Sequence, residues 1–112
     1  MKNSAKIYFP LFDNDGNDMD ALKQFVIKDS IMYFGGLTTY SASGYYMMND
    51  GIVKADKIEI LEYYFDSMIY HAGSYPIDYL KGLAQVICND AKQECVLLVI
   101  DNESFFINKK GE

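Results

Sequence analysis

The stretch FGGLTTYSASGYYMMNDGIVKADKIEILEYYFD, from Phe34 to Asp66, constrains the fold more than any other part of the chain. Tyrosine, threonine, isoleucine and valine fill both halves of the stretch, and these residue types favour β-strands. Between the halves stand Asn49, Asp50 and Gly51. An Asp-Gly pair tolerates the positive φ angle that a tight hairpin turn requires. The stretch therefore predicts two long antiparallel strands joined at Asp50-Gly51.

The register of this hairpin follows from the sequence if Asp50 and Gly51 form a two-residue loop. Tyr45 then lies opposite Asp56. Gly44, in the middle of the first strand, is a candidate for a β-bulge or for a close approach to the backbone.

Three further strands and two helices are predicted from the apolar pattern. Strands are expected at Lys6–Phe12, where apolar residues alternate, at Glu94–Ile100, and at Phe105–Ile107. Helical spacing predicts one helix over about residues 18–33, with Gly35-Gly36 after its end, and a second from the Ser74-Tyr75-Pro76 start to about residue 92. The expected buried stripe of the first helix is Leu22, Phe25, Val26 and Met32, and that of the second is Ile77, Leu80, Leu83, Ile87 and Ala91.

Read in order, the elements are β-α-β-β-α-β with a short extra C-terminal strand, which is the split β-α-β order of ferredoxin-like domains. We expect an α+β fold in which two helices cover one face of an antiparallel sheet. At 112 residues, we expect one domain, ordered from about residue 5 to residue 108. Because Glu94–Ile100 is apolar on both sides, we also expect a homodimer through the uncovered face, at Leu97 or Leu98.

The formal charge is −6, and none of the ten basic residues is arginine. Arginine is the preferred side chain for phosphate and guanine recognition, so direct nucleic-acid binding is not expected. The acidic chain suits a protein partner with a basic surface. No segment approaches the ~18 consecutive apolar residues of a membrane span, and the N-terminus lacks a signal-peptide pattern. We therefore expect a cytoplasmic protein that does not bind membranes.

Cysteine and aspartate spacing gives no metal or cofactor site. Cys88 and Cys95 match neither a redox pair nor a zinc site, and we interpret both as reduced packing residues. Asp13, Asp15 and Asp18 surround a glycine as in a calcium-binding loop, but the first and twelfth positions of such a loop would be leucines. We interpret the segment as a solvated loop and helix cap.

His71 is the single histidine, and any acid-base chemistry near neutral pH would centre on it. Its setting, Tyr70-His71-Ala72-Gly73, favours a surface loop. The hairpin tyrosines can form either a contact surface, because each offers a large rigid ring and a hydroxyl, or part of the core. The sequence leaves these two alternatives open.

The segments FGGLTTYSASGYY, KADKIEILEYYFD and QECVLLVI together resemble small uncharacterised bacterial and phage proteins with a compact α+β fold. The resemblance implies this fold and a mobile-element origin. With the acidic charge, it leads to the hypothesis of a non-enzymatic, anti-CRISPR-like inhibitor that blocks a basic nucleic-acid-binding protein. No catalytic residue is assigned, and the expected partner-binding residues are Tyr40, Tyr45, Tyr46, Tyr63, Asp13, Asp15 and Asp18. The alternative is a small-molecule-binding or enzymatic ferredoxin-like homodimer with a site near His71 and the hairpin tyrosines.

Overall fold

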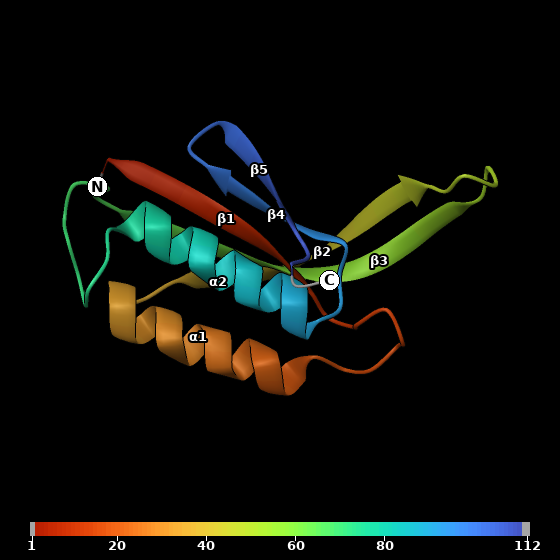
Figure 1. Ribbon diagram of the computed structural model, residues 1–112, viewed down its shortest axis with the longest axis horizontal. Coiled ribbons are helices and arrows are strands. Elements are labelled where there is room, and N and C mark those ends of the chain that lie inside the picture. Colours follow the sequence, from red (N-terminus) through yellow and green to blue (C-terminus); the bar gives the residue numbers. More distant parts are fainter. Residues whose placement is uncertain (1, 111–112) are drawn as a thin grey trace.

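The computed structural model describes residues 2–110 and consists of one sheet with two helices packed against it. In chain order the elements are β1 (Asn3–Pro10), α1 (Asp20–Phe34), β2 (Thr38–Met47), β3 (Val53–Phe65), α2 (Pro76–Asp90), β4 (Cys95–Ile100) and β5 (Glu103–Asn108). All neighbouring strands are antiparallel, in the order β2-β3-β1-β4-β5. Figure 1 shows both helices on the same side of the sheet. The predicted α+β class with two helices on an antiparallel sheet is therefore confirmed.

The core lies between the sheet and α2. Ile7 of β1 is paired with Leu61 of β3 and with Leu98 of β4, and all three side chains are fully buried. From α2, Leu80 and Ile87 are also fully buried. Burying an aliphatic side chain of this size contributes about 1.5–3 kcal/mol, so this layer accounts for much of the folding energy. The stripe predicted for the second helix is the one that packs against the sheet.

Helix α1 packs through a different face from the one expected. Phe25 and Met32 are 58% and 84% exposed, whereas Val26, Ser30 and Tyr33 are buried. Ser30 is accommodated because its hydroxyl and that of Tyr63 are hydrogen-bonded at 2.9 Å. Burial raises the pKa of Tyr63 to about 12. The prediction for Phe25 and Met32 is wrong because the helix buries the face that carries Ser30, where the Ser30 hydroxyl reaches the Tyr63 hydroxyl.

The helix ends agree with the sequence at one position and differ at another. Gly35 follows α1 in the left-handed conformation, with φ of 90°, as predicted for a glycine after a helix end. Pro76 opens α2 as predicted, but the capping position is Tyr75, in an extended conformation. The Ser74 hydroxyl instead faces the Tyr33 hydroxyl at 3.5 Å, so the predicted serine cap is wrong.

The β2–β3 hairpin turns where predicted but has a loop one residue longer. The backbone N–H of Met48 donates to the carbonyl of Ile52, and that of Gly51 donates to the carbonyl of Met48, both at 2.9 Å. Gly51 has φ of 84°. A turn closed in this way, with a left-handed glycine at its third loop position, is a three-residue hairpin loop. Tyr45 therefore pairs with Ala55, and the expected register was wrong by one residue.

Side chains alternate across the sheet, so residues next to Ile7, Leu61 and Leu98 point away from the helices. We call this second surface the open face. It is formed mainly by Tyr8, Tyr40, Tyr46, Lys54, Asp56, Ile58, Ile60, Cys95, Leu97, Val99 and Phe106. Leu98 lies on the helix side, so only Leu97 remains from the pair considered for self-association. Within residues 2–110, no helix is long and apolar enough to cross a membrane.

The hairpin geometry predicts a specific effect of substitution at Gly51. Valine strongly disfavours positive φ, whereas asparagine tolerates it, so Gly51→Val should lower the free energy of unfolding by about 1 kcal/mol or more. Gly51→Asn is the matched control and should lower the free energy of unfolding by less. Urea denaturation of the two variants measures the difference, and equal stabilities would contradict the turn described here.

Candidate functional site

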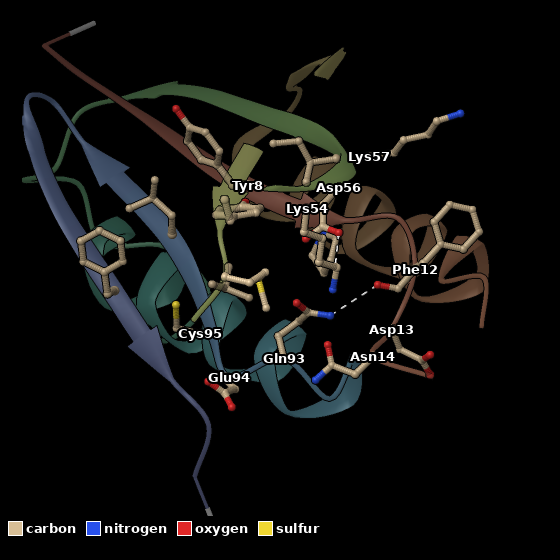
Figure 2. Close-up of a pocket in the computed structure, with 17 residues that line it drawn as sticks. Tyr8, Phe12, Asp13, Asn14, Lys54, Asp56, Lys57, Gln93, Glu94 and Cys95 are labelled. Atoms are coloured by element: carbon tan, nitrogen blue, oxygen red, sulfur yellow. Dashed lines mark hydrogen bonds and ion pairs between the residues drawn. The ribbon is translucent and has the colours of Figure 1, made fainter. Parts of the chain in front are cut away.

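A pocket of about 520 Å³ lies on the open face, where the sheet splits between β1 and β4. The β1–β4 ladder ends at the pair Ile7 and Leu98. Beyond this pair β1 continues to Pro10, which has no backbone N–H to donate to β4. Side chains from the strands on both sides of this gap line the pocket, and Figure 2 shows them together. The pocket is therefore a consequence of the early end of the β1–β4 pairing.

The pocket has an apolar and aromatic interior. Ile58 of β3 is 8% exposed, and Leu97 of β4 is half-buried. Tyr8 of β1, Tyr46 of β2 and Phe106 of β5 contribute aromatic rings from three different strands. An apolar cavity with a few polar groups at its edge is the usual form of a small-molecule site.

Two loops that are distant in sequence form the polar end of the pocket. The Asn14 side-chain amide donates to the carbonyl of Lys92, and the Lys92 ammonium contacts Asp15 at 3.0 Å. The Gln93 amide donates to the carbonyl of Phe12 at 3.4 Å, as Figure 2 shows. Exposed ion pairs contribute little stability. The bonds to backbone carbonyls nevertheless fix one loop against the other.

Asp13 lies in this end wall, and its carboxylate is hydrogen-bonded within its own loop. Its carboxylate accepts hydrogen bonds from the backbone N–H groups of Asn17 at 2.8 Å and Asp15 at 2.9 Å. The hydrogen bond from Asn17 is the main reason why the pKa of Asp13 is lowered. The loop is thus organised by hydrogen bonds around an ionised aspartate. In the part of the chain described, no cluster of three metal-ligating side chains is found.

Charged and titratable side chains lie on the hairpin wall of the pocket. Lys54 and Asp56 are 3.8 Å apart and form an ion pair. Burial raises the pKa of the nearby Tyr46 phenol, and electrostatic interaction with Asp56 and Cys95 raises it further. Tyr46 is therefore protonated at neutral pH and can donate a hydrogen bond to a ligand.

The residues expected to form one binding surface do not lie together. Asp13 and Tyr46 line the pocket. Tyr63 is fully buried in the core, so it cannot contact a partner. Tyr40 is 40% exposed and Tyr45 is 71% exposed. The aspartates Asp15 and Asp18 lie in the exposed β1–α1 loop, Asp15 paired with Lys92 and Asp18 accepting from the backbone of Asp20.

His71 does not belong to this pocket. It lies in the exposed connection between β3 and α2, whereas the pocket is lined by the start of β3 and by the residues that follow α2. Its ring contacts that of Tyr33, with 5.4 Å between the ring centres. The structure thus separates His71 from the hairpin tyrosine Tyr46 that lines the pocket.

Sequence reasoning missed several residues of the pocket: Tyr8, Lys54, Asp56, Gln93, Glu94 and Cys95. Their only sequence signal was an interruption of the expected pattern, namely a proline near the end of β1 and charged residues within β3. Cys95 is exposed, so the packing interpretation holds for Cys88 and is wrong for Cys95; both cysteines are free.

Comparison with solved structures places this architecture among known folds. A phage SAM lyase in complex with S-methyl-5′-thioadenosine matches with a TM-score of 0.64 and 18% identity, over 98% of this chain and 92% of that chain. A phage SAM lyase in the apo state matches with a TM-score of 0.66 and 16% identity, over 98% and 91%. No protein-family model matches the chain, and no curated protein matches it. At these identities the likeness shows a shared fold.

The hypothesis of a non-enzymatic inhibitor is corrected by these matches, because both structural neighbours are enzymes that act on a small molecule. The pocket agrees with this correction, since two of the expected contact residues line a cavity rather than a protruding surface. The acidic charge was interpreted as complementary to a basic protein partner, but it is equally complementary to a cationic small molecule. The small-molecule alternative is the interpretation that the comparison supports.

The two thiols should differ in reactivity. Cys95 is exposed in the pocket, whereas Cys88 is buried, donates to the carbonyl of Gln93 at 3.2 Å and has its pKa raised by burial. A thiol-specific reagent should therefore modify Cys95 at least about ten times faster than Cys88 in the folded protein. Cys95→Ser should remove the fast phase and Cys88→Ser should retain it. Two equally fast thiols would contradict this geometry.

Proposed function

We propose that this protein binds S-adenosylmethionine (SAM) in the open-face pocket and cleaves it as a lyase to S-methyl-5′-thioadenosine. The observation that carries the proposal is the likeness over 98% of the chain to a phage SAM lyase in complex with S-methyl-5′-thioadenosine. The pocket volume of about 520 Å³ supports it. Small-molecule sites typically enclose roughly 300–1,000 Å³.

The aromatic side chains of the pocket suit the adenine of such a ligand. Tyr8, Tyr46 and Phe106 come from different strands and surround the same cavity. Aromatic side chains stack on purine rings, and a base stacked in this way contributes about 1–3 kcal/mol to binding. The Tyr46 phenol additionally offers a hydrogen-bond donor to a ribose hydroxyl or a ring nitrogen.

The charged side chains suit the remainder of SAM, which carries a sulfonium, an ammonium and a carboxylate. Asp56 and Glu94 supply negative charge that attracts SAM and can bind its ammonium, and Lys54 supplies positive charge for the carboxylate. SAM has one net positive charge, so the charge of −6 on the chain also favours its approach. The product S-methyl-5′-thioadenosine is neutral and has lost these charged groups.

The bond that breaks joins the sulfur to the γ-carbon of the methionine portion, because S-methyl-5′-thioadenosine retains the methyl and adenosyl groups. The neutral thioether leaves with the electron pair of that bond. If the substrate carboxylate bonds to the same carbon, a lactone forms, and atoms and charge balance without water. Two opposite charges then disappear in the transition state, and weakly polar surroundings favour such a step over the charged ground state. Ile58 and Leu97 provide these surroundings.

Ligand binding and turnover test the proposal directly. S-methyl-5′-thioadenosine at ~100 times its dissociation constant should stabilise the fold by about 2.7 kcal/mol in thermal unfolding. It should also slow modification of Cys95, which lines the pocket. Incubation with SAM should release S-methyl-5′-thioadenosine, detected by chromatography. Neither stabilisation by the product nor release of it from SAM would refute the proposal.

Glu94→Gln separates charge recognition from recognition of the nucleoside. Removing this exposed carboxylate should weaken binding of cationic SAM by about twofold to fivefold. Its effect on neutral S-methyl-5′-thioadenosine should be smaller. Glu103→Gln is the matched control, because Glu103 is also exposed and does not line the pocket. Equal losses of affinity for both ligands would exclude a role of the Glu94 charge in recognising SAM.

We also propose that two copies associate through the open face. Leu97, Val99 and Phe106 lie on this face outside the helix-covered core, and Phe106 is 65% exposed. A two-fold contact would hide these side chains from water without producing open polymers. Because Leu97 also lines the pocket, such a contact would lie next to the ligand. The protein partner with a basic surface stays an untested prediction and is not needed here.

Leu97→Glu should disrupt this self-association and leave a folded monomer. The reason is that a carboxylate would be buried without a partner in the proposed contact. Val86→Glu is the control, since Val86 is 42% exposed on α2, on the helix side. Light scattering at high micromolar concentration measures the mass, and a monomeric unmodified protein would overturn the dimer.

We infer in addition that the fold is ferredoxin-like with an extra edge strand. In support, β3 lies between β1 and β2, and β1 lies between β3 and β4, so each β-α-β unit is split by a strand of the other. We propose a cytoplasmic location because SAM is a metabolite of the cytoplasm.

A further inference from the structure

Gly44 occupies a position where the backbone does not require glycine. It lies in β2 opposite Asp56, within an uninterrupted ladder, so the expected bulge is absent from this strand. Positive φ is found at four other glycines, Gly16, Gly35, Gly51 and Gly73, but not at Gly44. Glycine in a strand interior costs stability relative to residues with a side chain. A different contact must therefore account for glycine at this position.

That contact is the ring of Tyr46, which lies back along β2 over Gly44. A β-carbon at position 44 would be 2.6 Å from the Tyr46 hydroxyl oxygen, 3.1 Å from Cζ and 3.3 Å from Cε2. These distances are too short for any side chain at position 44 to share the space with the ring in its present place. Residues two apart in a strand point to the same face, so both positions look into the pocket side of the sheet.

The ring of Tyr46 forms part of the pocket wall, so moving it would change the shape of the cavity. Tyr46 pairs with Lys54, and Gly44 pairs with Asp56. Because the ring lies over Gly44, the phenol hydroxyl lies closer to Asp56 than the pairing of Tyr46 with Lys54 alone would suggest. The raised pKa of Tyr46, caused by burial and by electrostatic interaction with Asp56 and Cys95, agrees with this placement.

We propose that Gly44 is a positioning residue for the nucleoside part of the ligand, because the missing side chain lets Tyr46 fold back and form the pocket wall. The inference rests on the proposed function for the identity of the ligand, a purine nucleoside. Gly44 itself need not touch the ligand. A side chain at position 44 displaces the ring of Tyr46, since a tyrosine side chain moves more easily than the strand backbone.

The first experiment needs no ligand. The phenol of Tyr46 can be followed by ¹³C NMR with tyrosine labelled at Cζ, and its resonance assigned by its loss in Tyr46→Phe. In the unmodified protein it should titrate above the usual range for tyrosine. In Gly44→Ala its pKa should fall towards the ordinary value, because the ring leaves its partly buried site. An unchanged Tyr46 titration in Gly44→Ala would overturn the positioning role.

The second experiment measures binding of S-methyl-5′-thioadenosine by calorimetry. Gly44→Ala should weaken binding by about fivefold or more, as expected for a lost or misplaced stacking ring. Its stability in urea should be equal to or above that of the unmodified protein, because alanine is less costly than glycine in a strand. Gly36→Ala is the control, since its β-carbon would meet open space. Loss of binding together with loss of stability would indicate a structural role and contradict the proposal.

A double-mutant cycle connects the two residues. In a Tyr46→Ala background there is no ring to displace, so Gly44→Ala should have little further effect on binding. Additive effects would show that Gly44 acts without Tyr46 and would refute the inference. If the unmodified protein neither binds S-methyl-5′-thioadenosine nor releases it from SAM, the proposed function fails. The ligand-free titration then still decides whether Gly44 positions the ring.

Discussion

The pairing of β1 with strands on both sides is the constraint on which the rest of this structure depends. Ile7 lies between Leu61 and Leu98, so one buried row joins the β2–β3 hairpin to the β4–β5 hairpin. In the sheet of the described residues, strand pairing joins the two hairpins only through this central strand. Because β1 pairs with β4 over three residue pairs only, the hairpins separate beyond Ile7. The same strand therefore holds the core together and opens the pocket, as the diverging hairpins in Figure 1 illustrate.

Sequence patterns predicted the elements of this fold better than the details of their contacts. Long alternating and apolar runs gave the strands and the packed face of α2, because these signals repeat over many residues. The hairpin register was wrong by one residue because a left-handed Gly51 satisfies both a two-residue and a three-residue loop. The inner face of α1 was wrong because Ser30 is buried by a hydrogen bond to Tyr63, 33 residues away along the chain. A helical wheel cannot show such a partner.

The candidate site was less predictable than the fold, since it exists only where distant segments meet. Asp13 and Tyr46 were selected from the sequence for other reasons, and neither had a visible connection to Gln93 or Glu94. The bond from Asn14 to the carbonyl of Lys92 spans 78 residues. One local signal was present, because a glycine two residues before a tyrosine in a strand allows the ring to fold back. Gly44 was considered for a close approach, but the group that approaches is this side chain rather than another backbone.

The net charge of −6 misled the functional hypothesis because charge alone does not distinguish a basic protein from a small cation. The pocket geometry adds the missing information. A surface that binds a protein needs acidic groups spread over a broad area, whereas here the half-buried Asp56 and the exposed Glu94 line one cavity together with the buried Ile58 and the half-buried Leu97. Carboxylates at the edge attract a cation, and an apolar interior favours a reaction in which that cation loses its charge. If carboxylates replaced the apolar residues inside, they would stabilise the charged substrate more than the transition state and would slow the cleavage.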